Sequence, residues 1–153
     1  MTRAWIATGA NLGRRAEQIE AALEALRADP RVEGLVASPL VETDPVGGPP
    51  GQPRFLNGVC RLEFDGEAEE LLALLHELED RVGRRREVRD GPRPLDLDLL
   101  FFGDRRSGAP GLRLPHPRLE ERAFVLEPLA ALAPDLRLPR CGLTVAQRLA
   151  QLR

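Results

Sequence analysis

The stretch Leu95–Phe102 constrains the fold more than any other part of this chain. It is apolar except for Asp96 and Asp98, and a short apolar run of this kind predicts a buried central strand. Residues two apart on a strand project from the same face, about 6.5 Å apart. We therefore expect both carboxylates on the face that also carries Leu100 and Phe102. Two like charges beside a hydrophobic face need a counter-charge.

Hydrophobic periodicity predicts the elements that surround this strand. We expect β structure at residues 4–9, 32–41 and 55–64. Two helices are marked by apolar residues at helical spacing: Ile19, Ala22, Leu23 and Leu26 in the first, and Leu71, Leu75, Leu78 and Val82 in the second. The first is expected to stop at Asp29-Pro30 and the second at Gly83. In the C-terminal part, Pro117 and Pro128 suit first helical positions.

The resulting order is β-α-β-β-α-β, which is typical of the ferredoxin-like split βαβ arrangement. The 153 residues are about the length of one ordinary domain. We therefore predict a single α+β domain over residues 1–153, with a ferredoxin-like core and a C-terminal helical extension.

Composition excludes several classes of protein. With 42% hydrophobic and 30% charged residues, the chain is in the globular range. All 22 basic residues are arginine and tyrosine is absent, which excludes P-loop and Schiff-base enzymes, because both need lysine. Cys60 and Cys141 are far apart in the sequence and indicate free thiols in a reducing compartment. The N-terminus does not resemble a signal peptide and no run suits a bilayer span, so we expect a cytoplasmic protein without a membrane partner.

A strongly basic segment runs directly into the aspartate pair. It contains Glu87, Asp90 and six arginines, a net charge of +4 in a chain of net charge −2: Arg81, Arg84, Arg85, Arg86, Arg89 and Arg93. Arginines bind phosphate oxygens bidentately, and Mg²⁺ takes carboxylate oxygens together with substrate phosphates. The pattern therefore indicates phosphoryl-transfer chemistry. The alternatives are a solvated strand end or a salt bridge between the aspartates and arginine, and Arg81 and Arg84 could simply offset a helix dipole.

Four blocks of sequence carry a more specific signal. They are Ala7-Thr-Gly-Ala-Asn-Leu-Gly13, Glu42-Thr-Asp-Pro-Val-Gly47 with Phe55-Leu-Asn57, Arg89-Asp-Gly-Pro-Arg-Pro-Leu-Asp-Leu-Asp-Leu-Leu100, and Leu114-Pro-His-Pro-Arg-Leu-Glu-Glu-Arg-Ala-Phe124. In this order, the blocks resemble the signature segments of the 6-hydroxymethyl-7,8-dihydropterin pyrophosphokinases of folate biosynthesis. The resemblance runs along most of the chain.

This resemblance implies an ATP-dependent diphosphotransferase. It implies transfer of a pyrophosphoryl group from MgATP to the hydroxymethyl group of a reduced pterin, with release of AMP. The expected partners are these two small molecules and two Mg²⁺ ions, without nucleic acid. We expect the enzyme to be a monomer.

The resemblance also assigns residues to roles. It makes Asp96 and Asp98 the ligands of the two Mg²⁺ ions, and Arg84 and Arg93 the clamps on the triphosphate. Further residues that line the ATP site would be Glu79, Arg86, Leu99, His116 and Arg122. The pterin would lie between Phe55 and Phe124, with its polar edge read by Asn57 and by the backbone at Thr43 and Val46. Without the family context, the two phenylalanines would be core residues and Asn57 a polar residue at a strand edge.

The sequence departs from the family pattern at a few positions. Asp90 stands where the family often has an aromatic residue just before Gly-Pro-Arg, and the Arg-rich loop is shortened. Pro117 stands where a tyrosine can occur, and Phe55 has no hydroxyl group. These departures affect lid closure and phosphate contacts, and they leave the aspartate pair and Arg93 unchanged.

A different class of function is a ferredoxin-like module that binds RNA or a nucleotide without catalysis. RNA readers of this shape need exposed aromatic residues on their two central strands. Only 4% of the residues here are aromatic, and the strand that would carry them carries aspartates. The two hypotheses differ in a simple measurement, because RNA binding weakens steeply with salt and ATP binding would depend on Mg²⁺.

Overall fold

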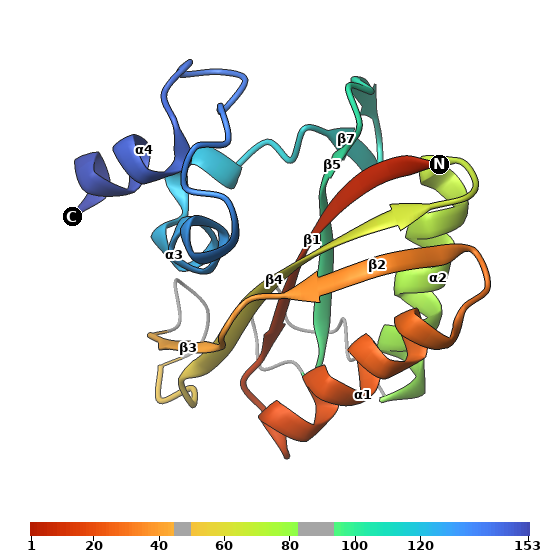
Figure 1. The fold of residues 1–153 in the computed structure, drawn as a ribbon. Helices are drawn as coiled ribbons and strands as arrows, with labels where there is room; N and C mark the ends of the chain where they lie inside the picture. The colour runs from red at the N-terminus through yellow and green to blue at the C-terminus, as the bar shows by residue number, and fades with distance from the viewer. Residues whose placement is uncertain (45–49, 83–93) are drawn as a thin grey trace.

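The computed structural model describes residues 1–44, 50–82 and 94–153, and an antiparallel sheet lies at its centre (Figure 1). The strands run in the order β2-β4-β1-β5, and the short β3 also pairs with β4. Their bounds are β1 Thr2–Ala10, β2 Val32–Ala37, β3 Val41–Thr43, β4 Phe55–Phe64 and β5 Asp96–Phe102. The predicted β structure is confirmed, although the segment at residues 32–41 is divided between β2 and β3.

Helices cover both faces of this sheet (Figure 1). Their bounds are α1 Arg15–Ala28, α2 Ala68–Arg81, α3 Ala123–Leu132 and α4 Val145–Leu152, with a single 3₁₀ turn η1 at Leu119–Glu121 and a small hairpin of β6 Ser107–Ala109 and β7 Leu112–Leu114. The two predicted helices and the α+β class are therefore confirmed. Among the helices of the described ranges, none has the length and apolarity needed to span a bilayer.

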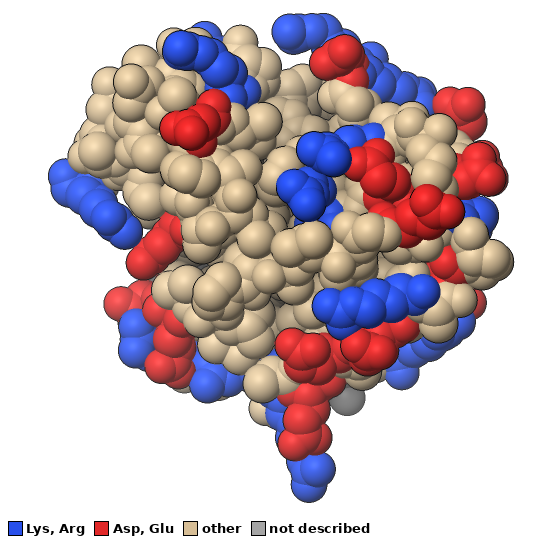
Figure 2. Space-filling view, viewed as in Figure 1, with Lys and Arg blue, Asp and Glu red and all other residues tan. Residues whose placement is uncertain are grey.

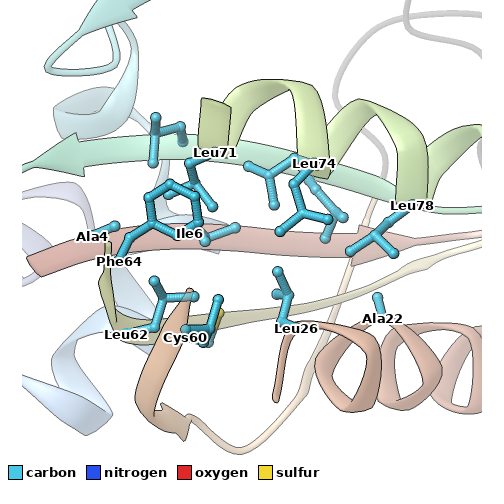
Figure 3. Close-up of a cluster of buried hydrophobic side chains, with 14 of the residues drawn as sticks. Ala4, Ile6, Ala22, Leu26, Cys60, Leu62, Phe64, Leu71, Leu74 and Leu78 are labelled. Carbon is cyan, nitrogen blue, oxygen red and sulfur yellow. The ribbon is translucent and has the colours of Figure 1, made fainter. Parts of the chain in front are cut away.

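The larger hydrophobic core lies between the sheet and the pair α1 and α2 (Figure 3). Ile6 of β1 and Phe64 of β4 are fully buried there against Leu26 of α1 and Leu71 of α2. Burial of a side chain of this size stabilises the fold by about 1.5–3 kcal/mol. The apolar stripes that predicted the two helices are thus the surfaces that hold them on the sheet.

The second core lies on the opposite face of the sheet. Trp5 and Val59 face α3 and α4 there, with Leu126 of α3 and Leu149 of α4 buried against them. The sheet therefore has no solvent-exposed face along β1 and the middle of β4. This burial explains why β1 has an unbroken run of buried residues, Ala4–Ala10.

The pairing of β1 with β5 contains a β-bulge. Ile6 pairs with Leu99, whereas the preceding Trp5 pairs with Phe101. Leu100 is therefore an extra residue in β5 with no direct partner in β1. A bulge of this kind breaks the alternation of side chains between the two faces of a strand.

The bulge corrects one sequence prediction. Asp96, Asp98 and Leu100 occupy the face toward α3 and α4, as expected for alternate residues, but Phe102 does not share that face. Phe102 lies in the core beside α1 and α2, where its ring meets Phe64 edge-on at 6.5 Å between centroids. The prediction was wrong because the extra residue shifts the alternation by one position before Phe102.

The predicted positions of Pro117 and Pro128 are also wrong. Pro128 lies inside α3 and is buried, although its ring leaves the carbonyl of Phe124 without the usual N–H partner. The helix begins earlier because the carbonyl of Arg122 accepts hydrogen bonds from the N–H groups of Val125 and Leu126, at 2.9 and 3.0 Å. Pro117 lies before η1 and is not its first residue.

The two cysteines are expected to differ sharply in reactivity. Burial in the larger core raises the pKa of the Cys60 thiol to about 12, whereas Cys141 is exposed. Because the thiolate is the reactive form, Ellman's reagent at pH 8 should modify one thiol in the native protein and two in denaturant. A Cys141→Ser variant should react only after unfolding. Rapid modification of that variant in its native state would contradict the described core.

Candidate active site

Asp96 and Asp98 stand at the start of β5, on the sheet face toward α3. In the neighbouring strand they are paired with Gly9 and Ala7, and both are half-buried. The two partners in β1 are small residues, so no bulky side chain of this strand stands beside the carboxyl groups. The sequence prediction that both carboxyl groups share one face is confirmed by this register.

Gly9 has a second neighbour in β4. It pairs there with Asn57, and a Cβ at position 9 would lie only 2.9 Å from Asn57 Oδ1. A larger residue would therefore displace the amide. This explains the glycine in the first motif block, and it brings the amide of β4 next to the strand that borders Asp96.

Asn57 is 7% exposed and is held by a neighbouring strand. Its Nδ2 donates a hydrogen bond to Thr43 Oγ1 of β3, and Thr43 is paired with Phe55. Because Nδ2 is the donor in this contact, Oδ1 is the acceptor end of the amide. Thr43, Phe55 and Asn57, three residues assigned by the resemblance, thus lie together on the sheet face that carries the aspartates.

Phe124 approaches the same sheet face from the helical layer. It is the second residue of α3, half-buried, and packs on the second core. The guanidinium carbon of Arg122 lies 5.5 Å from the centroid of its ring, a distance typical of a cation–π contact. The structure therefore supplies one aromatic ring from β4 and one from α3, and it places a cation beside the second.

His116 lies between the end of β7 and η1, close to the aspartates and to Arg122. The backbone N–H of His116 donates to the carbonyl of Leu100 at 3.0 Å. Its ring Nδ1 accepts from the backbone N–H of Arg118 at 3.2 Å. The pKa of His116 is lowered to about 4, mainly because the side chain is buried and next because of the positive charge of Arg122. The charge of Asp96 acts in the opposite direction and raises the pKa. His116 is therefore neutral at pH 7, with its proton on Nε2.

Glu79 lies on the opposite side of β5 from these groups. It is fully buried, and its Oε2 accepts a hydrogen bond from the N–H of Leu97 at 2.8 Å. Leu97 is the residue between Asp96 and Asp98, so α2 fixes the backbone that presents the pair. Leu99 is likewise buried, in the core beside α1 and α2. The side chains of Glu79 and Leu99 thus lie behind the strand.

The structure also identifies supporting residues that the sequence reasoning missed. Asn11, 1% exposed, donates from Nδ2 to the carbonyl of Pro53 at 3.1 Å and to Gln52 Oε1 at 3.2 Å. Gln18 donates from Nε2 to the carbonyl of Leu12 at 2.9 Å and also to the carbonyl of Pro94. These amides join the turn after β1 to the residues that precede β4 and β5. Asn11 directly follows a buried strand, which is its sequence signal, whereas Gln18 lies within α1 and has no comparable signal.

Four of the predicted site residues lie outside the described ranges: Val46, Arg84, Arg86 and Arg93. Near β3, the described arginines are paired with acids: Arg15 and Arg54 both bind Glu42, and Arg54 also binds Asp44 at 3.1 Å. On the face shown in Figure 2, arginine and acidic side chains are interspersed and form no continuous basic surface.

The residues present fit a metal that is shared with a substrate. Within residues 1–44, 50–82 and 94–153, no three histidine, cysteine, aspartate or glutamate side chains form a cage. The aspartate pair offers two carboxyl groups on one face, and Mg²⁺ typically combines one or two carboxylates with water and substrate phosphates. The donor set therefore suits a site that is completed by a phosphorylated ligand.

Comparison with known proteins decides the family. The model of the family described as 7,8-dihydro-6-hydroxymethylpterin-pyrophosphokinase (HPPK) matches residues 5–134. This chain belongs to that family. The resemblance inferred from the four sequence blocks is confirmed, and so is the assignment to an enzyme family of diphosphotransferases.

Individual relatives of this HPPK chain agree. It is 48% identical to the 2-amino-4-hydroxy-6-hydroxymethyldihydropteridine pyrophosphokinase of Pseudomonas aeruginosa, over 90% of this chain and 84% of that protein. It is 38% identical to the protein of the same name from Methylorubrum extorquens, over 99% of this chain and 94% of that protein. The Folic acid synthesis protein fol1 of Schizosaccharomyces pombe is 41% identical over 87% of this chain, which corresponds to 18% of that longer protein.

The bond between Glu79 and Leu97 generates a stability prediction. Replacement Glu79→Ala should lower the free energy of unfolding by about 2–3 kcal/mol, because it leaves a buried N–H group without its acceptor. Urea denaturation followed by circular dichroism would measure this loss. The matched control is Glu77→Ala, which removes from the same helix an exposed carboxyl group that is paired with Arg81. This change should cost less than about 0.5 kcal/mol. Equal losses in the two variants would contradict a supporting role for Glu79.

Proposed function

We propose that this HPPK family member transfers the pyrophosphoryl group of ATP to the hydroxymethyl group of 6-hydroxymethyl-7,8-dihydropterin, as a step of folate biosynthesis. The observation that carries the proposal is the shared face: Asp96 and Asp98 lie on the same side of the sheet as Asn57, with the rings of Phe55 and Phe124 contributed by opposite layers. A pair of acids that could bind phosphate through Mg²⁺ thus adjoins a surface suited to a flat, polar-edged ring. The family match and the printed names of the relatives support the same reaction.

We assign Asp96 and Asp98 to two Mg²⁺ ions. Bound ions would supply positive charge for the phosphate oxygens of ATP. The chain's own contribution is the fixed spacing of the carboxyl groups, set by the strand and by the bond from Leu97 to Glu79. Glu79 and Leu99, which the resemblance placed along the ATP site, act in this proposal through the backbone of β5, because their side chains are buried behind it.

The remaining ATP contacts are assigned to cations and to one neutral donor. Arg122 is half-buried beside the ring of Phe124, and the neutral His116 has Nε2–H as its free donor, since Nδ1 is bonded to Arg118. Four residues complete the proposal from outside the described ranges: Arg84, Arg86 and Arg93 as phosphate ligands and the backbone of Val46 on the pterin side. Arginine suits this role, because its planar fork matches phosphate oxygens.

The pterin is assigned to the surface formed by Phe55, Asn57 and Phe124. Offset aromatic faces suit a planar heterocycle. Since Nδ2 of Asn57 is held by Thr43, Oδ1 is available to accept from an N–H group at the edge of the ring. The backbone of Thr43 would complete this polar edge. The hydrogen bond between Asn57 and Thr43 therefore sets the orientation in which the amide group of Asn57 would bind the pterin.

The transfer is proposed as one direct displacement. The hydroxymethyl oxygen attacks the β-phosphorus of ATP, the bond from that phosphorus to the oxygen bridging to the α-phosphorus breaks, AMP leaves, and the hydroxyl proton passes to water. No covalent enzyme intermediate is needed. The chain has no lysine or tyrosine, and Ser38 is committed to hydrogen bonds with Val59 and Pro39. Catalysis then rests on positioning and charge neutralisation.

The proposal includes the ferredoxin-like topology and a single domain. If the short β3 is set aside, the element order is β-α-β-β-α-β, and the observed strand order β2-β4-β1-β5 fits the split βαβ pattern. The two unpaired cysteines support a reducing, cytoplasmic location. We propose a monomer, since the exposed large apolar side chains of the described ranges are scattered over the fold: Met1, Leu12, Val36 and Leu152. The RNA-binding alternative is not favoured by the family match.

Loss of either aspartate should abolish turnover without loss of the fold. Asp96→Asn and Asp98→Asn each remove a charged ligand, and each also relieves repulsion between like charges, so the metal-free variants should unfold at the same temperature as the parent or higher. Thermal unfolding and a turnover assay with MgATP would test this pair of outcomes. Asp135→Asn, which changes an exposed aspartate, is the control and should keep full activity. Near-normal activity in both variants would refute the metal assignment.

The nucleotide product distinguishes pyrophosphoryl transfer from ordinary phosphoryl transfer. The purified protein, incubated with MgATP and 6-hydroxymethyl-7,8-dihydropterin, should form AMP and a pterin diphosphate in equal amounts, because attack falls on the β-phosphorus. Anion-exchange chromatography with mass spectrometry would identify both products. Omission of the pterin is the control and should leave ATP intact. Formation of ADP, or no pterin-dependent consumption of ATP, would overturn the proposed reaction.

A further inference from the structure

A cavity of about 530 Å³ lies on the same sheet face as the candidate active site, at the far end of β1 and β5. Trp5 and Phe101, which are paired across these strands, line it. Gly9, the partner of Asp96, is four residues further along β1, about 13 Å away at the usual rise of a strand. The volume is in the range of small-molecule binding sites. The cavity is therefore separate from the candidate active site.

The charged residues that line this cavity are four arginines and one acid. They are Arg3, Arg105, Arg106, Arg137 and Asp104. Arg3 is bound to Glu63 at 2.7 Å, and Arg105 binds both carboxyl oxygens of Glu69, with Nη2 to Oε2 at 2.6 Å. These two ion pairs fix the positions of two guanidinium groups and neutralise their charge.

The other two arginines are not neutralised in this way. Arg106 is exposed and has no ion pair or hydrogen bond with the described part of the chain, while Arg137 donates only to the carbonyl of Gly142, at 2.8 Å. That contact orients the guanidinium group of Arg137 and leaves its charge uncompensated. Against the single charge of Asp104, the lining retains an excess positive charge. A small anion would complement it through charge-assisted hydrogen bonds.

Two aromatic side chains line the cavity. Trp5 is 6% exposed, and the guanidinium carbon of Arg61 lies 5.9 Å from the centroid of its ring. Phe101, half-buried beside it, adds a second aromatic side chain. Aromatic side chains of this kind favour offset or edge-on packing with another ring.

We propose that this cavity binds a small organic anion that consists of a planar ring bearing a carboxylate or a phosphate group. The ring lies on Trp5 and Phe101, and the anionic group binds Arg106 and Arg137. This inference does not rest on the proposed function, because none of these residues belongs to the candidate active site.

Trp5 offers a direct test, because it is the only tryptophan and the chain has no tyrosine. Its emission therefore reports on the cavity. The probes are AMP and benzoate, which combine a ring with a phosphate or a carboxylate, and adenosine and inorganic phosphate, which each supply one part. Titrations are run in EDTA without Mg²⁺, so that nucleotide binding at the metal-dependent candidate active site is suppressed. We expect a saturable change with AMP, benzoate or both, and binding at least about tenfold weaker for adenosine and for phosphate.

Variants assign the signal to the cavity. The double variant Arg106→Gln, Arg137→Gln should weaken binding of the responding probe at least about tenfold, whereas Arg113→Gln, an exposed arginine that does not line the cavity, should leave it unchanged. Calorimetric titration gives the same comparison without fluorescence, and circular dichroism checks the fold. The proposal is overturned if neither ring-bearing anion binds, if adenosine or phosphate binds as tightly, or if the double variant binds as well as the parent.

Discussion

The hydrogen bond from the N–H of Leu97 to the buried carboxyl group of Glu79 is the contact on which the site depends. β5 is an edge strand of the sheet formed by the described residues, where no further strand accepts from its outer N–H groups. Helix α2 supplies the missing acceptor from within the core. The residues on either side of Leu97 are Asp96 and Asp98, and their direction therefore follows from a contact made behind the strand. The positions of the two carboxyl groups on one face of the sheet are thus fixed by the packing of α2 on the other face.

Much of this arrangement could be predicted from the sequence, because it follows from patterns among residues that are close together in the chain. The apolar stripes of α1 and α2, the alternation of β4 and the spacing of Asp96 and Asp98 each follow from the period of a helix or a strand. The family resemblance could likewise be recognised, since its four blocks are short and keep their order. These features depend on neighbours in the sequence.

The features that could not be predicted depend on neighbours in space. The bulge at Leu100 arises from the register between β1 and β5, which no local pattern specifies. The acceptor role of Glu79 needs the position of α2 relative to β5, and the start of α3 ahead of Pro128 follows from the bonds of the Arg122 carbonyl. The cavity lined by Trp5 and Phe101 likewise combines residues from β1, β5 and the segment after α3.

The extra residue in β5 has a consequence for how this strand can change length. With Leu100 present, the aspartates face α3 while Phe102 packs with Phe64 on the opposite side. Deletion of Leu100 would restore regular alternation and would keep the carboxyl groups and Phe102 on their present faces, because Asp98 and Phe102 would then be three residues apart. The loss would instead fall on the second core, where Leu100 is one of the buried side chains. The bulge is therefore a position at which this strand can lose a residue without exchanging its two faces.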